Sequence, residues 1–130
     1  RKKSALAPIS SIDDPVIAAA TIMTAIVSED TVLSPDLEAG VRGQLAAIVS
    51  GEKLEEAMIY ATWASTQVAD VTHVIDIAGK YLSGKLSESE KHELVSMIVD
   101  AAPVGKRHAA FPDRIKRLRQ KLGLVEGSRS

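Results

Sequence analysis

The spacing of apolar residues along the chain is helical almost throughout. The first apolar segment, from about Pro15 to Ser28, is hydrophobic on nearly every side, and the helix-start signal Asp13-Asp14-Pro15 precedes it. A helix that is apolar all round is typical of the centre of a domain, where other elements cover every face. The sequence therefore predicts that this helix is the central element of the fold.

A second helix is predicted from Ser34-Pro35-Asp36 to a stop near Gly51. Its apolar residues recur at intervals of three and four, which places them on one face of a helix. They are Leu37, Val41, Leu45 and Ile48.

The segment from Glu52 to about Tyr81 keeps the helical spacing, and the pattern leaves open whether it forms one long helix or two. One apolar stripe contains Leu54, Met58, Ala61, Ala64 and Val68, and the next contains Val71, Val74, Ile75 and Ala78. A break could lie near Thr66-Gln67, and Ser83-Gly84 predicts the end of the segment.

The last third of the chain predicts two further helices separated by a loop. Ser87-Glu88-Ser89-Glu90 matches a capping box and opens a helix to about Asp100. Residues 101–110 have no periodicity and predict a loop. Pro112 then starts a helix with a stripe formed by Ile115, Leu118 and Leu122, and Gly123 is its expected C-cap.

These elements predict an all-α fold, a compact bundle of five to seven helices. The expected domain covers residues 13–124, between a basic flank or linker over residues 1–12 and a flexible tail over residues 125–130. Because only 3% of the residues are aromatic and alanine is frequent, we expect closely spaced helices that pack through small side chains. Trp63, the only tryptophan, is expected in the core.

Composition narrows the chemistry. The chain has 130 residues, 45% of them hydrophobic, which is enough for one globular domain with a real core. It contains no cysteine, which excludes disulfides, thiolate nucleophiles and cysteine-ligated metal sites. The absence of cysteine is compatible with a reducing compartment.

The formal net charge of −1 conceals a strong asymmetry. Residues 4–105 contain 5 basic and 15 acidic residues, whereas residues 106–130 contain 8 basic and 2 acidic ones. The basic C-terminal quarter could serve an anionic partner, or it could let the last helix dock on the acidic body, which is the interpretation we favour.

The last helix is the candidate partner-binding surface. Arg114, Arg117 and Lys121 lie at three- and four-residue spacing and are expected to form an exposed ridge, with Lys116 and Arg119 at its edges. The expected partner is another protein, with an anionic membrane surface as a second option. Nucleic acid is a weaker option, because aromatic residues do not interleave with the basic ones and the acidic body would repel phosphate.

Two stretches carry a resemblance to a known family. Residues 22–38 contain an apolar helix, an acidic turn and a serine-proline helix start followed by leucine. Residues 99–101, 107–115 and 121–124 contain an acidic position, a histidine before the last helix and a Leu-Gly-Leu ending. Together these motifs resemble the tellurite-resistance TerB-like domain family over about residues 13–124.

The resemblance implies a seven-helix bundle of two pseudo-repeated units, each with an acidic turn linked to metal binding. In the first turn Thr31 stands in place of the family's glycine, and in the second Phe111 stands at the glutamate position. The acidic residues left for a divalent cation are Glu29, Asp30, Asp36 and Glu38. Asp36 and Glu38 are also explained by the first turn of a helix, where acidic residues are favourable. We therefore expect no cofactor beyond a weakly bound divalent cation that folding does not require.

Catalytic motifs are scarce. The sequence has no phosphate-binding glycine loop, nucleophile elbow or paired-histidine metal helix. His73 lies three residues from both Asp70 and Asp76, a cluster that could bind metal or transfer a proton, although a surface salt bridge is the interpretation we favour. His92 has the same explanation, and His108 is expected to cap the last helix. We predict that the protein is not an enzyme.

The expected function is that of a non-catalytic interaction module, which the resemblance would place in a membrane-associated or stress- or metal-related assembly. A nucleic-acid-binding domain and a weak divalent-cation sensor are the alternatives. A membrane-spanning helix needs about 18 consecutive apolar residues, and no apolar run in the sequence approaches that length. Arg1-Lys2-Lys3 resembles the cytoplasmic flank of a membrane anchor, but an ordinary chain start explains it equally. The expected location is the cytoplasm, free or attached to an anchor, and the oligomeric state is left open.

Overall fold

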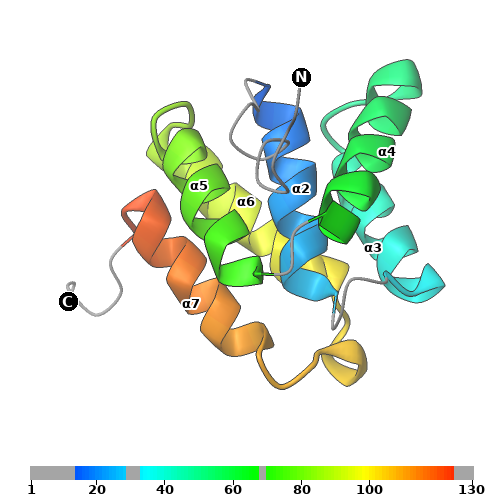
Figure 1. Cartoon of the computed structure of the whole chain (residues 1–130). Helices are drawn as coiled ribbons and strands as arrows, with labels where there is room; N and C mark the ends of the chain where they lie inside the picture. The colour runs from blue at the N-terminus through cyan, green and yellow to red at the C-terminus, as the bar shows by residue number, and fades with distance from the viewer. Residues whose placement is uncertain (1–13, 29–32, 68–69, 125–130) are drawn as a thin grey trace.

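A computed structural model describes residues 14–28, 33–67 and 70–124. The described residues form helices without strands, as the sequence predicts (Figure 1). In chain order these elements are α2 (Pro15–Val27), α3 (Pro35–Leu45), α4 (Gly51–Gln67), α5 (Val71–Ser83), α6 (Glu88–Ala101), the short 3₁₀ helix η1 (Val104–Lys106) and α7 (Phe111–Leu122). The predictions for residues 1–13 and 125–130 lie outside the described residues.

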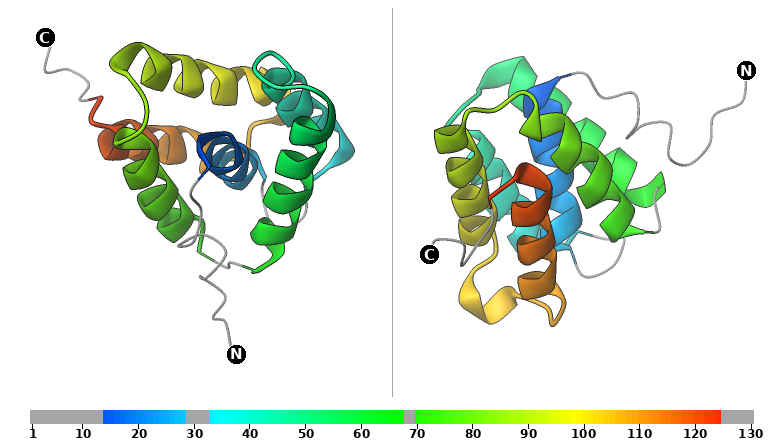
Figure 2. Two further views of the ribbon diagram at one scale, coloured as in Figure 1. Left: turned by 90° about the horizontal axis from the view of Figure 1, so that it is seen from above. Right: turned by 90° about the vertical axis from the view of Figure 1, so that its left-hand side faces the viewer.

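Helix α2 is the centre of the bundle, and this prediction is confirmed. Figure 2 shows α2 end-on, with the other helices arranged around it. It contacts α3, α4, α5, α6 and α7, and every residue from Ala18 to Val27 is buried. Ile22, Met23 and Ile26 are completely enclosed. The all-round apolar pattern of α2 is therefore explained by neighbours on every side.

Local start and stop signals set the helix ends. The Asp14 carboxylate accepts hydrogen bonds from the first free amides of α2, and the Ser34 hydroxyl does the same for α3. Ser87 and Glu90 form the expected capping box at the start of α6. Gly123 adopts φ +81° directly after α7, a left-handed conformation that favours glycine. The predicted caps at these ends are confirmed.

The middle segment forms two helices rather than one. Helix α4 ends at Gln67 and α5 begins at Val71, so the break lies just after the Thr66-Gln67 region. Asp70 is the N-cap of α5, and its carboxylate accepts a hydrogen bond from the amide of Thr72 at 3.0 Å. Because the segment is divided here, α4 and α5 both contact α2 as separate helices.

Small residues allow the helices to approach closely, as predicted. A β-carbon built on Gly40 of α3 would lie 2.1 Å from the carbonyl oxygen of Ala101 in α6. A β-carbon on Gly79 of α5 would lie 2.9 Å from the β-carbon of Lys121 in α7. Both distances are shorter than van der Waals contact. The close packing of α3 on α6 and of α5 on α7 therefore requires glycine, which has no side chain, at these positions.

Two apolar predictions are wrong. Helix α3 ends at Leu45, before the predicted stop, and Ile48 is 47% exposed instead of lying on the buried stripe. Trp63 is also 47% exposed rather than part of the core. Helix α4 turns Ala57, Ala61 and Ala64 inward, and Trp63 lies on the other side of the helix. None of the described helices is both long and apolar enough to cross a membrane.

Candidate functional site

The acidic cluster considered for a cation is only partly described. Glu29 and Asp30 lie outside the described residues. Asp36 and Glu38 occupy the first turn of α3, where Asp36 lies 3.0 Å from the Lys106 ammonium and Glu38 lies 3.7 Å from the Arg42 guanidinium. Among residues 14–28, 33–67 and 70–124, no three His, Cys, Asp or Glu side chains gather as a metal site would require.

Arg114 does not belong to an exposed ridge, contrary to the prediction. Its side chain is half-buried, and Nη1 donates to the carbonyl oxygens of Ser28 at 2.8 Å and Ala25 at 3.2 Å, at the C-terminal end of α2. The carbonyls at a helix C-terminus have no partner within the helix and carry partial negative charge. Burial lowers the pKa of Arg114. Arg114 is therefore a structural cap for the central helix.

His108 binds the same end of α2. The amide of Ala110 donates to Nδ1 of His108 at 3.1 Å, so Nδ1 is the acceptor nitrogen of the ring. The proton on Nε2 can then be donated to the carbonyl oxygen of Ile26, 2.9 Å away. The predicted capping of the last helix is wrong, because no side chain in the described part of the chain caps the first turn of α7; His108 instead joins the residue that precedes α7 to the end of α2.

Arg117 also points to the body of the protein rather than away from it. Its guanidinium forms a two-pronged ion pair with Asp76 of α5, at 2.7 and 2.9 Å, and Lys121 lies 3.8 Å from the same carboxylate. The hydrogen bond from Arg117 lowers the pKa of Asp76, and Asp76 in turn raises the pKa of Arg117. The predicted separate ridge is wrong for Arg117, while Lys116 and Lys121 are exposed and Arg119 is half-buried.

Ion pairs and caps thus support the interpretation that the basic last segment docks on the acidic body. Arg107 donates to the carbonyl oxygens of Ala102 at 2.7 Å and Val99 at 3.0 Å, at the end of α6. Two arginines therefore cap two helix C-termini, and a third binds a carboxylate. The positive charge counted in the sequence is partly committed within the fold.

The histidine clusters have local partners. Asp70 caps α5 and Asp76 binds Arg117, so both carboxylates beside His73 have structural roles. His92 lies 3.9 Å from the Glu88 carboxylate one turn earlier in α6. A polar groove of about 570 Å³ lies between the start of α5 and α7. Its lining mixes acidic and basic groups, among them Asp113 and Lys116.

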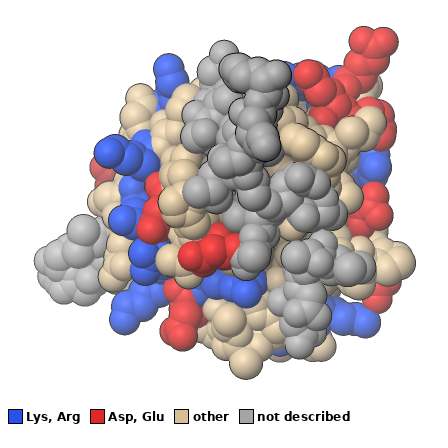
Figure 3. Space-filling model, in the orientation of Figure 1, with Lys and Arg blue, Asp and Glu red and all other residues tan. Residues whose placement is uncertain are grey.

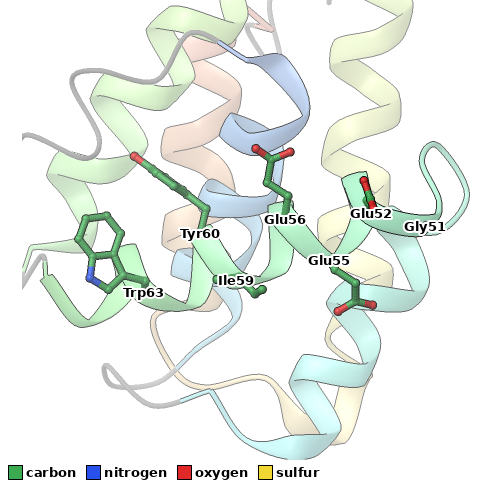
Figure 4. Close-up of a pocket in the computed structure, with 7 residues that line it drawn as sticks. All are labelled: Gly51, Glu52, Glu55, Glu56, Ile59, Tyr60 and Trp63. Carbon is green, nitrogen blue, oxygen red and sulfur yellow. The ribbon is translucent and has the colours of Figure 1, made fainter.

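A groove lies along the outer side of α4 (Figure 4). It is shallow, has a volume of about 790 Å³, and is mostly apolar. We call its lining the α4 face; it consists of Gly51, Glu52, Glu55, Glu56, Ile59, Tyr60 and Trp63. Glu52, Ile59 and Trp63 recur at seven- and four-residue spacing, which makes one continuous stripe on a helix.

Two large apolar side chains of the α4 face are exposed to solvent, Ile59 at 68% and Trp63 at 47%. The Trp63 ring packs edge-on against Tyr60, with the ring centroids 5.7 Å apart. Tyr60 in turn packs on a small buried cluster that includes Ala25 of α2. The indole is therefore positioned by the core although much of its surface remains accessible.

Acidic and apolar residues occupy opposite ends of the α4 face. Glu52 and Glu55 lie toward the start of α4, and Tyr60 and Trp63 lie toward its end (Figure 4). Figure 3 shows acidic side chains at the upper right, where α4 lies in Figure 1, and basic side chains on the left. Acidic side chains also lie among the basic ones on the left, so the two signs of charge are only partly separated on this face.

The sequence predictions missed the α4 face. The sequence analysis predicts the partner surface on α7, from its basic residues, and predicts Trp63 in the core. A signal was nevertheless present, because the inward stripe through Met58, Ala61 and Ala64 leaves Ile59 and Trp63 together on the opposite side. Comparison of the chain with family models, curated proteins and solved structures gave no match.

Proposed function

We propose that this protein is a non-catalytic helical module that binds another protein through the α4 face. The observation that carries the proposal is the exposure of Ile59 and Trp63 side by side on a helix whose opposite side belongs to the core. Single exposed apolar residues are ordinary, but an apolar patch rimmed by polar groups is typical of an interaction surface.

The residue types support this assignment. Tryptophan and tyrosine are enriched among the residues that contribute most to protein–protein affinity, because they bury large areas with few rotatable bonds. Trp63 is already held against Tyr60, so little further ordering is needed on binding. The α4 face therefore offers a preformed anchor toward one end of a shallow groove.

The alternatives have less support. Binding of nucleic acid through α7 would require its basic side chains to be available. Arg114 already binds the end of α2, and Arg117 already binds Asp76. A divalent-cation sensor would use Asp36 and Glu38, which lie beside Lys106 and Arg42. The resemblance to TerB-like domains would place the module in a membrane-associated or stress- or metal-related assembly, and it rests on sequence motifs alone.

The proposal is tested by site-specific photocrosslinking in the cells that produce the protein. A photoreactive amino acid replaces Ile59 in one variant and Lys116, exposed on α7, in another. We expect a discrete crosslinked protein from position 59 and none from position 116. The captured protein is then identified and purified, and its affinity for the full chain is measured.

The affinity measurement decides the outcome. Trp63→Ser should weaken binding by about tenfold or more, since it removes the largest exposed anchor. Thr62→Ala, an exposed position next to Trp63 but outside the α4 face, should leave the affinity unchanged. Capture only from position 116, or equal affinities for wild type and Trp63→Ser, would refute binding through α4.

A further inference from the structure

We infer that the segment bound by the α4 face is a basic amphipathic helix of the partner protein. This inference rests on the proposed function and specifies the chemistry of the partner. The apolar end of the face, formed by Ile59, Tyr60 and Trp63, calls for apolar side chains. The acidic end, formed by Glu52, Glu55 and Glu56, calls for lysine or arginine beside them.

The negative charge of the acidic end is only partly neutralised, because each nearby cation lies close to two carboxylates. Arg42 lies 2.5 Å from Glu55 and also pairs with Glu38. Lys53 binds Asp14 and lies 3.7 Å from Glu56. Glu52 is exposed and forms no ion pair with any residue that the structure describes. Around this end, five carboxylates therefore face two cations, and an incoming cation would be attracted.

The shape of the face favours a helix as its occupant. Helix α4 has 17 residues, so it is about 25 Å long, and its exposed stripe runs along its axis. Adding a strand requires a free sheet edge, and the described residues contain no strand. A second helix can instead lay side chains at three- and four-residue spacing along the groove.

A second copy of the chain fits the α4 face poorly. Two α4 helices packed in parallel would place glutamates against glutamates, and packed antiparallel they would place glutamates against Ile59 and Trp63. Helix α7 of a second copy has the cations but no apolar stripe to offer, because Ile115, Leu118 and Leu122 are buried. An anionic membrane would be repelled by the same glutamates.

The test uses Trp63, the only tryptophan, as an intrinsic fluorescent probe of the full chain. Three tryptophan-free peptides of about 17 residues, matched to the length of α4, are titrated. The first carries leucine at helical spacing flanked by lysine, the second replaces every lysine by glutamate, and the third has the first composition without the periodicity. We expect a saturable fluorescence change with the first peptide and affinities weaker by about tenfold or more for the others.

Charge reversal on the protein provides the decisive comparison. The double variant Glu52→Lys, Glu56→Lys should bind the basic peptide about tenfold more weakly than the wild type does. It should bind the acidic peptide more tightly. Glu93→Lys with Asp100→Lys, two exposed positions on α6, changes the net charge equally and should leave both affinities unchanged. Circular dichroism verifies that each variant is folded.

Several results would overturn the inference: equal affinity for the basic and acidic peptides, loss of binding in the α6 control as well, or a dimer that forms through position 59. The protein captured by crosslinking keeps the two proposals separate. If its binding depends on Trp63 but not on Glu52 and Glu56, the basic-helix inference fails and the proposed function stands. If no protein is captured at position 59, the proposed function itself fails.

Discussion

Replacing Gly40 by alanine should destabilise the protein, whereas the same change at Gly43, one turn later in α3, should stabilise it. Alanine is favoured over glycine in a helix interior by up to about 1 kcal/mol. Nothing lies within 4 Å of a β-carbon at Gly43, so that gain is available there. At Gly40 the new β-carbon would lie 2.1 Å from a backbone carbonyl oxygen of α6, which no side-chain rotation can move.

The magnitude follows from the shift that the clash requires. An ordinary contact needs at least 3.4 Å, so α3 and α6 must separate by roughly an ångström along a face packed by Leu37 and Val41. Overpacking of this kind typically costs about 1–3 kcal/mol, and a clash with backbone belongs at the upper end. After the helix-propensity gain, Gly40→Ala should lose about 1–2 kcal/mol, giving a difference of about 2–3 kcal/mol from Gly43→Ala.

The free energy of unfolding is measured by urea denaturation, followed by far-ultraviolet circular dichroism. The slope of the transition should be unchanged in both variants, because neither alters the surface exposed on unfolding. If Gly40→Ala is as stable as Gly43→Ala, then α3 and α6 do not approach as closely as the structure shows. The small-residue packing argument would then be refuted.

Three further perturbations test the contacts within the fold. Arg114→Ala should lower the free energy of unfolding by about 1–3 kcal/mol, because it uncaps α2, and the exposed Lys116→Ala should leave it nearly unchanged. Arg117 lowers the pKa of Asp76, so this ion pair stabilises the fold above about pH 4, and the stabilisation is lost as the pH falls further. In the variant Asp76→Asn, the free energy of unfolding should therefore depend less on pH in the acidic range. Thr24→Val should raise the free energy of unfolding by about 1 kcal/mol in urea titration, because the Thr24 hydroxyl is buried without a hydrogen bond to any described residue.

The predictions that the structure confirms depend on signals local in sequence. A helix N-terminus is set by an acceptor side chain and the amides two or three residues later, as at Asp14 and Ser87. A left-handed C-cap at Gly123 needs only one residue. The central place of α2 was predictable for the same reason, because its own composition leaves no polar side to face water.

The predictions that failed depend on where a side chain meets a distant element. Ile48 continues the apolar spacing of α3, but the helix ends at Leu45. Beyond that residue, helical spacing no longer places a side chain on the buried face. Arg114 and Arg117 lie beside a buried stripe and were expected to keep their charges in water. Their partners come from α2 and α5, about 90 and 40 residues away in sequence, and nothing in α7 alone indicates them.

Charge counting therefore found the uneven distribution of charge along the chain, but it could not show which of the cations already have partners within the fold. A basic segment in a chain with an acidic body can neutralise that body first, and Arg117 with Asp76 and Lys106 with Asp36 show this pairing. Each such pair removes a cation from the surface offered to a partner, and each arginine cap on a helix end does the same. The acidic groups near the start of α4 are not neutralised to this extent, because Arg42 and Lys53 are each shared by two carboxylates. The unbalanced charge thus lies on the same face of α4 as Ile59 and Trp63, at the opposite end, and it is this combination on which the proposed basic, apolar partner segment rests.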